Sequence, residues 1–472
     1  MRQVRVMPAE IQVFPTAALG DTTYLLTIGS DAALVDPQRD AWRFLAAAES
    51  QGLTVRYVLE THVHNDYVSG ALEVRAATGA QVVAPAKGAY RFPHLAMAEG
   101  DELELGGVVL RAMDTPGHTP EHLAYLVAES GRPVAVFTGG SLLLGSAGRT
   151  DLLGDPSTEQ LTRAQFHSLR RLADLPDATL VLPTHGAGSF CAATVAQKQP
   201  PSTIGRQRRD NPAMLAPDED SFVRQQLRGL PRYPSYYRHM APANRAGPAV
   251  LGGLPNLQAL SAADVDRLAR SGAWILDTRD RWSFAAAHLP GSINVELDDT
   301  FASFVGWVVP FAAPIVLVVP EDDASQAHQA RTQLLRIGYD QVDGYLDGGV
   351  RAWRSTGRPA RSYLVADIDD LRRADASDAP PLVLDVRQPE EWAQGVIPGS
   401  LRLFVGDLPE GVDQLPRDRE IWTICRSGHR AAIAASLLDR GGRQVRLVAH
   451  GGVERWLALS PATDEVPHAA RR

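Results

Sequence analysis

Cysteine is scarce in this chain: only Cys191 and Cys425 occur in 472 residues, and more than 200 positions separate them. This scarcity excludes a disulfide framework and favours a reducing compartment, in which a thiol stays free. Long apolar runs are missing as well. The most apolar stretch, residues 305–319, is interrupted by Pro310 and Pro314 and is too short to span a bilayer.

A surplus of positive charge is also lacking, because 55 acidic residues outweigh 47 basic ones and leave a net charge of -8. This balance argues against a nucleic-acid surface and against a membrane-binding patch. The first residues show no apolar segment followed by a small-residue cleavage site, so no secretory signal is expected. We therefore expect a cytoplasmic protein without nucleic-acid or membrane partners.

The length predicts about three domains of ordinary size. In the first 190 or so residues, short apolar runs alternate with turns, and helical spacing of apolar residues occurs at 41–51 and 158–172. Many strands with few helices predict two packed sheets flanked by helices. The expected strands are 11–14, 23–28, 32–35, 55–59, 82–84, 103–105, 108–113, 124–127, 134–137 and 180–182.

Residues 197–255 change character, because prolines and arginines become dense. We expect an irregular extension of the first domain that ends in a linker near residues 241–254. The alternative is a pure linker. Large apolar side chains such as Phe222, Tyr236 and Tyr237 argue against that alternative.

An internal repeat follows. Residues 274–295 and 381–403 share a strand, an Asp-x-Arg segment and a Pro-Gly-Ser turn, and 345–353 match 448–456 through Gly-Gly-Val. Each copy alternates strand and helix, which predicts two small α/β domains with largely parallel sheets. The expected domains are therefore residues 1–250, 256–360 and 363–472.

The second copy carries a thiol where a predicted strand, residues 420–424, ends at Cys425. A loop with Arg426, Gly428 and Arg430 follows, and then a helix-forming segment. Amide N–H groups, the helix dipole and the two arginines favour the thiolate form and can hold an anion beside it. The alternative is a buried structural cysteine, for which two arginines and a glycine are a poor setting. The first copy has an acidic loop and no thiol at this place, so we expect it to be non-catalytic.

The loop Cys-x-x-Gly-x-Arg, the segments LDVRQPEEW and VIPGS, and the tail HGGVERW resemble the rhodanese family of sulfurtransferases over residues 381–457. The resemblance implies that Cys425 accepts a sulfane sulfur as a persulfide and passes it on. Arg430, with Arg426 nearby, would position the anionic donor. Asp385 and Arg387 would support the loop from behind.

A second cluster of polar residues follows strand ends in the first domain. His62, His64 and Asp66 come after the strand near residues 55–60, and His118 and His185 stand in two later loops. Loops at one edge of a sheet can converge, so these side chains could hold a divalent cation. The alternative is that they are ordinary packed or surface residues.

These loops, with residues 136–151 and 208–212, resemble the glyoxalase II and persulfide dioxygenase branch of the metallo-β-lactamase fold over residues 11–212. The whole chain resembles persulfide dioxygenase–rhodanese fusion proteins: an αββα sandwich followed by two rhodanese domains. The resemblance implies a mononuclear non-haem iron centre that oxidises persulfide sulfur to sulfite with O2, and a rhodanese module that exchanges sulfur with thiosulfate. The implied partners are thiosulfate, persulfides of low-molecular-weight thiols, and other copies of the chain in a homo-oligomer.

Two positions depart from that family: Tyr67 stands in place of a histidine and Gly140 in place of a metal-binding aspartate. We therefore expect no two-metal centre, but a cluster of His62, His64 and His118 that suits one zinc better than one iron. Weak or altered metal binding and reduced dioxygenase activity follow. The alternatives are a zinc thioester hydrolase of the glyoxalase II type and a non-enzymatic scaffold that binds thiols.

Four further residues are candidates for the thiol pocket of the first domain. Arg149 belongs to a segment that matches the rim of the family's active site, and Cys191 follows His185 closely enough to relay sulfur. Tyr236 and Tyr237 could line the pocket. All of them except Arg149 could equally be core residues.

Overall fold

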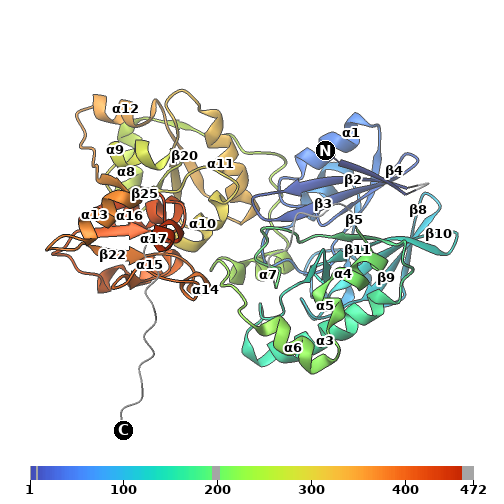
Figure 1. Cartoon of the computed structure of the whole chain (residues 1–472). Helices are drawn as coiled ribbons and strands as arrows, with labels where there is room; N and C mark the ends of the chain where they lie inside the picture. Colours follow the sequence, from blue (N-terminus) through green and yellow to red (C-terminus); the bar gives the residue numbers. More distant parts are fainter. Residues whose placement is uncertain (1, 7–8, 194–201, 460–472) are drawn as a thin grey trace, which may run out of the picture.

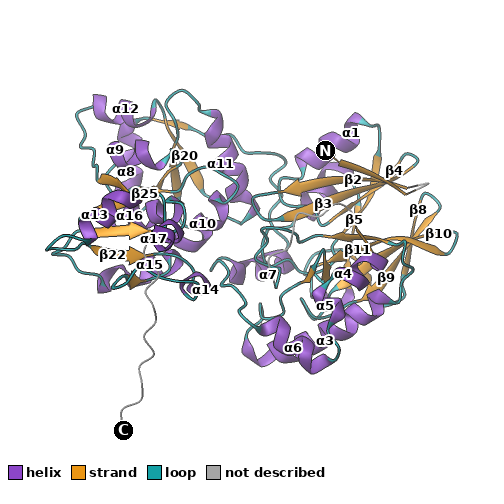
Figure 2. Ribbon diagram, viewed as in Figure 1, coloured by secondary structure: helices purple, strands orange, loops and turns teal. Residues whose placement is uncertain are grey.

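The computed structural model describes residues 2–6, 9–193 and 202–459. It consists of a two-sheet module at the N-terminal end and two smaller α/β modules that lie beside it (Figure 1). The predicted fold class is confirmed, and every strand expected in the first 190 residues lies within an observed strand (Figure 2). None of the helices in these ranges combines the length and the apolar composition that a membrane crossing needs.

The first sheet has seven strands, antiparallel from β1 to β4 and parallel from β4 to β7. The strands are β1 (Arg2–Val6), β2 (Ala9–Thr16), β3 (Asp21–Ile28), β4 (Asp31–Val35), β5 (Thr54–Leu59), β6 (Gln81–Pro85) and β7 (Leu95–Met97). Alternate residues of β3 point to opposite faces, as the period of two requires. Leu26 therefore packs between the sheets and Leu25 packs under the outer helices.

The second sheet has the order β15-β14-β11-β10-β9-β8. Its strands are β8 (Glu102–Leu105), β9 (Val108–Asp114), β10 (Leu123–Glu129), β11 (Arg132–Gly139), β14 (Leu180–Pro183) and β15 (Ser202–Thr203), with a small hairpin of β12 (Leu142–Leu143) and β13 (Ser146–Ala147) beside it. Leu110 and Phe137 meet the first sheet in the central core. Loops that follow β5, β9 and β14 meet at one edge of this sandwich and carry the histidines.

Helices cover both outer faces, which completes the αββα sandwich. On the first sheet lie α1 (Trp42–Ser50) and α2 (Ala71–Thr78), and a 3-10 turn, η1 (Ala86–Gly88), follows β6. On the second sheet lie α3 (Asp155–Ala173), α4 (Ile204–Asp210), α5 (Pro212–Leu215) and α6 (Glu219–Leu227). Phe44 of α1 and Phe222 of α6 are fully buried against their sheets.

The segment expected to be linker is partly helical. Helix α7 (Tyr237–Ala246) includes residues 241–246 and lies between the first module and the other two (Figure 1). It is anchored because the side chain of Asn244 donates to the carbonyls of His64 (2.9 Å) and Tyr67 (2.8 Å) and accepts from the amide of Ser69 (2.9 Å). These buried bonds hold the helix on the loop that carries the first histidines.

The two smaller modules share one topology, as the repeat predicted. Their five-stranded sheets are fully parallel and have the orders β16-β20-β19-β17-β18 and β21-β25-β24-β22-β23. The first contains β16 (Ala259–Leu260), α8 (Ala262–Arg270), β17 (Trp274–Asp277), α9 (Arg281–Ala286), β18 (Ile293–Asn294), α10 (Phe301–Val308), β19 (Ile315–Val318), α11 (Ser325–Arg336), β20 (Val342–Leu346) and α12 (Gly349–Ser355).

The second contains β21 (Leu364–Asp367), α13 (Ile368–Asp375), β22 (Leu382–Asp385), α14 (Pro389–Trp392), β23 (Leu401–Arg402), η2 (Val405–Asp407), α15 (Leu408–Gly411), η3 (Val412–Gln414), β24 (Ile421–Ile424), α16 (His429–Arg440), β25 (Val445–His450) and α17 (Val453–Leu459). One apolar cluster runs through all three modules. Tyr67 of the first, Val305 of the second and Phe404 of the third belong to it.

Candidate functional site

Cys425 stands directly after β24, inside a short loop that ends where α16 begins. Its side chain is 1% exposed, and the backbone N–H of Gly428 donates to its Sγ at 3.2 Å. Gly428 has a φ of +93°, and a Cβ there would overlap the carbonyl oxygen of Ala449. The turn therefore needs glycine, and it aims a main-chain donor and the positive end of α16 at the sulfur.

An ion pair supports the neighbouring strand. Arg387 grips both oxygens of Asp385 at 2.7–3.0 Å, and its guanidinium also donates to the carbonyl of Gly395 at 2.7 Å. Asp385 is paired in register with Ile424, the residue before Cys425. Both charged groups are buried, so the pair holds the strand ends beneath the loop.

The two arginines of the loop differ in their surroundings. Arg430 is mostly buried and binds Glu391 of α14, with Nη2 2.9 Å from Oε1. Burial alone would lower the pKa of Arg430, but Glu391 and the nearby Cys425 sulfur outweigh it and raise that pKa. Arg426 is 66% exposed and pairs with Glu454 at 3.0 Å. Arg430 is thus the fixed positive charge beside the sulfur.

The first copy has an acidic residue in the corresponding loop, where the strand registers match Glu321 with Ser427. Glu321 follows β19 and accepts from the backbone N–H of Arg351 at 2.8 Å, with a second contact of 3.3 Å to the Arg351 guanidinium. In the second copy Glu454 stands at the position of Arg351 and pairs with Arg426 at 3.0 Å. A carboxylate at this place repels anionic sulfur donors.

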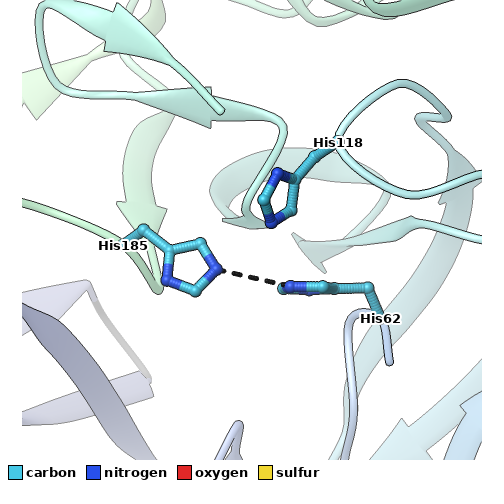
Figure 3. A group of neighbouring side chains, drawn as sticks. All are labelled: His62, His118 and His185. Atoms are coloured by element: carbon cyan, nitrogen blue, oxygen red, sulfur yellow. Dashed lines mark hydrogen bonds between the residues drawn. The ribbon is translucent and has the colours of Figure 1, made fainter. Parts of the chain in front are cut away.

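Three histidines converge at the edge of the sandwich (Figure 3). His62, His118 and His185 come from the loops after β5, β9 and β14, and one nitrogen of each lies within 4.8 Å of the others. All three side chains are fully buried. The nearest nitrogens, Nε2 of His62 and Nε2 of His185, are 3.3 Å apart.

Hydrogen bonds settle which nitrogen of each ring faces the shared space. Nδ1 of His62 lies 2.8 Å from Thr61 Oγ1, Nδ1 of His118 lies 2.7 Å from the Arg149 carbonyl, and Nδ1 of His185 lies 2.8 Å from Asp21. Each Nε2 is therefore the nitrogen that faces the others, and Nε2 of His118 has no hydrogen-bond partner among the described residues. Such outer partners are typical of metal-binding histidines.

The charge state and spacing also fit a metal. Burial holds the pKa of His62, His118 and His185 below the ordinary value of 6.5, which keeps the rings neutral. Two nitrogens bound to one tetrahedral zinc lie about 3.3–3.4 Å apart. The observed 3.3 Å between His62 and His185 matches this spacing. These residues can hold one divalent metal.

His64 is turned to a different set of partners. Its Nε2 lies 3.2 Å from Asp36 and 3.4 Å from Glu60. Burial alone would lower the pKa of His64, but these carboxylates outweigh it and raise the pKa to about 9. The cluster expected from the sequence was His62, His64 and His118. In the structure His62, His118 and His185 form one group, and His64 belongs to two others, with Asp36 and His62 and with Asp66 and His185. Nδ1 of His64 is buried and has no hydrogen-bond partner among the described residues. Sequence reasoning missed Asp36, whose signal was a charged residue directly after an apolar strand.

Asp66 lies behind the cluster. One carboxylate oxygen is 3.3 Å from Nδ1 of His185, on the side of the ring that Asp21 also contacts. Burial raises the pKa of Asp66 to about 7 and that of Asp21 to about 8, and the two carboxyl groups interact directly. Asp66 also groups with His64 and His185, and one possible ligand atom of each lies within 4.8 Å of the others.

The two departures from the family pattern change the site. Tyr67 stacks on His64 with ring centroids 4.4 Å apart, and its hydroxyl group donates to the Asp36 carbonyl at 3.2 Å. A Cβ at Gly140 would overlap Cδ2 of His118 and lie 2.8 Å from Cγ and Nε2 of that ring. The His118 ring therefore occupies the space that a carboxylate at position 140 would need.

The four candidates for a thiol pocket are all buried. Arg149 binds Asp151 at 2.7 Å, and burial raises the pKa of Cys191 well above its ordinary value. Tyr236 donates to the Asp66 carbonyl at 2.8 Å, and it packs with Tyr237 in the cluster shared with the second module. The structure places them in the packed boundary between modules.

The chain resembles two families. Residues 18–185 match the metallo-beta-lactamase superfamily, and residues 261–356 and 367–459 match the rhodanese-like domain. Among curated relatives, a hydroxyacylglutathione hydrolase of Cereibacter sphaeroides is 32% identical over 250 residues, 52% of this chain and 90% of that protein. One of Rhodospirillum rubrum is 40% identical over 155 residues, 32% of this chain and 56% of that protein.

Solved structures point the same way. A metallo-beta-lactamase from Staphylococcus aureus subsp. aureus COL matches with a TM-score of 0.64 and 26% identity, covering 71% of this chain and 98% of that one. ETHE1 from Myxococcus xanthus is 30% identical, with a TM-score of 0.44, and covers 50% of this chain and 98% of that one. The two family matches and the hydrolase relatives support a role in sulfur chemistry or in hydrolysis, and a divalent metal in the first module.

Proposed function

We propose that Cys425 is the nucleophile of a sulfurtransferase. The chain belongs to the metallo-β-lactamase superfamily in its first module and carries two rhodanese-like domains after it. One observation carries this proposal. The sulfur accepts a hydrogen bond from the Gly428 N–H at 3.2 Å, at the start of α16 and beside the buried charge of Arg430. Main-chain donors and fixed positive charge stabilise a thiolate and an incoming anion.

The chemistry needs no other reagent than a donor and an acceptor. The Cys425 thiolate attacks the outer sulfur of thiosulfate, an S–S bond forms, and the S–S bond of thiosulfate breaks as sulfite leaves with the electron pair. A nucleophilic acceptor then attacks the terminal sulfur of the persulfide and restores the thiolate. We propose thiosulfate and persulfides of low-molecular-weight thiols as donors, in a compartment that keeps thiols reduced.

For the first module we propose that His62, His118 and His185 hold one zinc ion. Neutral imidazoles suit zinc, which would supply a Lewis acid and a cross-link between three loops. An iron oxygenase site needs two histidines and a carboxylate. Gly140 offers no carboxylate at the family's position, and the carboxylates that group with histidines here are Asp36, with His62 and His64, and Asp66, with His64 and His185. A dioxygenase with a compromised centre is therefore our interpretation of this module.

The test compares the only two thiols of the chain. We expect Cys425→Ser to abolish thiosulfate:cyanide sulfurtransfer and Cys191→Ser to retain it, because burial raises the pKa of Cys191 well above its usual value. Incubation with thiosulfate should add the mass of one sulfur atom to the Cys425 peptide alone. Retained activity in Cys425→Ser would refute the assignment.

A zinc thioester hydrolase is the second candidate, favoured by the 32% identity that extends over 90% of a hydroxyacylglutathione hydrolase. Its test is hydrolysis of a hydroxyacylglutathione thioester by protein of measured metal content. Oxygen uptake with glutathione persulfide tests the dioxygenase in the same preparation. We expect neither activity above a His118→Ala control, and fast turnover in either assay would overturn our view of the first module.

A further inference from the structure

A side chain from the first rhodanese-like domain reaches the cysteine loop of the second. Nη1 of Arg281, at the start of α9, donates to the carbonyl oxygen of Ser427 at 2.7 Å. Its side chain is only 12% exposed. Glu296 holds it in place, since its carboxylate accepts from Nε at 3.0 Å, from Nη2 at 2.5 Å and from the Arg281 backbone N–H at 2.8 Å.

The carbonyl that Arg281 binds belongs to the same peptide group that contacts the Cys425 sulfur. The C=O of Ser427 and the N–H of Gly428 are the two ends of one planar unit, and in a trans peptide they point in opposite directions. That N–H is the group that donates to Cys425 Sγ at 3.2 Å. A donor on the carbonyl side therefore fixes the direction of the N–H on the sulfur side. The positive charge also polarises the peptide, which strengthens its N–H as a donor.

Other groups of the first copy enclose the same loop. His429, the residue after Gly428, lies 3.9 Å from Glu296 and 3.9 Å from Asp298, and its ring meets the Phe304 ring with centroids 5.1 Å apart. The cysteine loop is thus bounded by the copy that has no thiol of its own. A Cβ at Gly428 would overlap Nη1 of Arg281, so the close approach of this side chain depends on glycine.

We infer that Arg281 is a positioning residue for Cys425, and that the first rhodanese-like domain completes the site of the second by orienting the Ser427–Gly428 peptide. The inference rests on the proposed role of Cys425 as nucleophile. Without Arg281 the peptide can rotate, the Gly428 N–H leaves the sulfur, and the thiolate loses a charge-assisted hydrogen bond.

The chain offers a matched control at the same interface. Arg361 binds Asp439 in the last turn of α16, with Nε 2.9 Å and Nη2 2.7 Å from the carboxylate oxygens. It joins the linker between the two copies to the helix that follows the cysteine loop, but no hydrogen bond or ion pair links it to residues 425–430 in the described structure. Its loss weakens packing without touching the peptide group.

The experiment follows the alkylation rate of Cys425 by iodoacetamide against pH, in full-length protein that carries Cys191→Ser. We expect Arg281→Gln to move the midpoint of the profile upward by about one pH unit, the value of one hydrogen bond to a charged acceptor. At pH values below both midpoints, alkylation should slow by up to about tenfold. Arg281→Lys should fall between this variant and the parent. Arg361→Gln should lower the melting temperature and leave the profile unchanged.

A parent-like profile in Arg281→Gln, or an equal shift in Arg361→Gln, would overturn the inference. Should Arg281→Gln not fold, Glu296→Gln keeps the arginine but loosens its clamp, and it should shift the profile in the same direction by a smaller amount. Alkylation needs no sulfur donor. If the parent, the full-length protein with Cys191→Ser, shows no sulfurtransferase activity, the proposed function is refuted. The pH profiles would still decide the role of Arg281.

Discussion

Gly140→Asp puts back the carboxylate that related metal sites carry, and we expect it to damage this site. The added Cβ would overlap Cδ2 of His118 and stand 2.8 Å from its Cγ and Nε2, where ordinary contacts are 3.4–4 Å. Cδ2 of the ring must retreat by about an ångström or more, since the new Cβ would overlap it. This movement weakens the 2.7 Å bond of the ring to the Arg149 carbonyl and shifts Nε2 relative to the other two histidines.

The magnitude follows from overpacking in a tight interior, which costs about 1–3 kcal/mol, before the cost of an added buried carboxylate. In a domain of this size each kcal/mol lowers the melting temperature by about 2–4 °C. The control is Gly140→Ala, which carries the overlap but not the charge. We expect both variants to melt lower and to bind less zinc than the parent.

The assay combines elemental analysis with thermal unfolding on protein purified without chelators. Gly140→Asp combined with Tyr67→His would then test whether both family ligands together rescue binding. Stoichiometric metal and an unchanged melting temperature in Gly140→Asp would refute this reasoning. That outcome would mean that the His118 ring yields freely and that only a carboxylate was missing.

Two other variants probe the remaining features. His185→Ala should remove most of the bound zinc, whereas His64→Ala should leave more than half of it, as measured on parallel preparations; equal losses would contradict the observed grouping of histidines. Asp439→Asn should cost about 1–2 kcal/mol near neutral pH, since buried Asp439 accepts from His288 and Arg361. Burial alone would raise the pKa of Asp439, but these bonds hold it below 3.8. The contribution of these bonds to the free energy of unfolding is complete above about pH 4 and is lost as the pH falls through the lowered pKa of Asp439. Urea titrations of parent and variant should therefore give the same free energy of unfolding in acid. A difference that persists at low pH would contradict this assignment.

The strands, the repeat and the cysteine loop could be predicted because they depend on local pattern. The apolar run of β5 ends in a turn that places His62 and His64 at a sheet edge. The residues of the cysteine loop are contiguous in the sequence, between β24 and α16, so their pattern can be read directly. Residues 241–246 were predicted less well. Their helix depends on Asn244, whose partners lie more than 170 positions earlier.

The direction of a ring could not be predicted, because it depends on partners from other strands. His64 turns its Nε2 to Asp36, a residue with a φ of +50° after β4, and leaves its Nδ1 without a hydrogen-bond partner among the described residues. His185 faces inward because Asp21 fixes its Nδ1 from 164 positions away. Arg281 escaped notice for the same reason: its partner Ser427 lies in another copy of the repeat.

The apolar cluster that joins Tyr67, Tyr236, Val305 and Phe404 determines how the chain can be divided into parts. Domains on flexible linkers can be separated without exposing a core. Each of the three modules of this chain would expose apolar surface if it were separated from the others, and exposed apolar surface promotes aggregation. A fragment of this chain that contains one module alone is therefore expected to aggregate more readily than the whole chain. The three modules are better described as one packed unit with a shared core than as a series of separable enzymes.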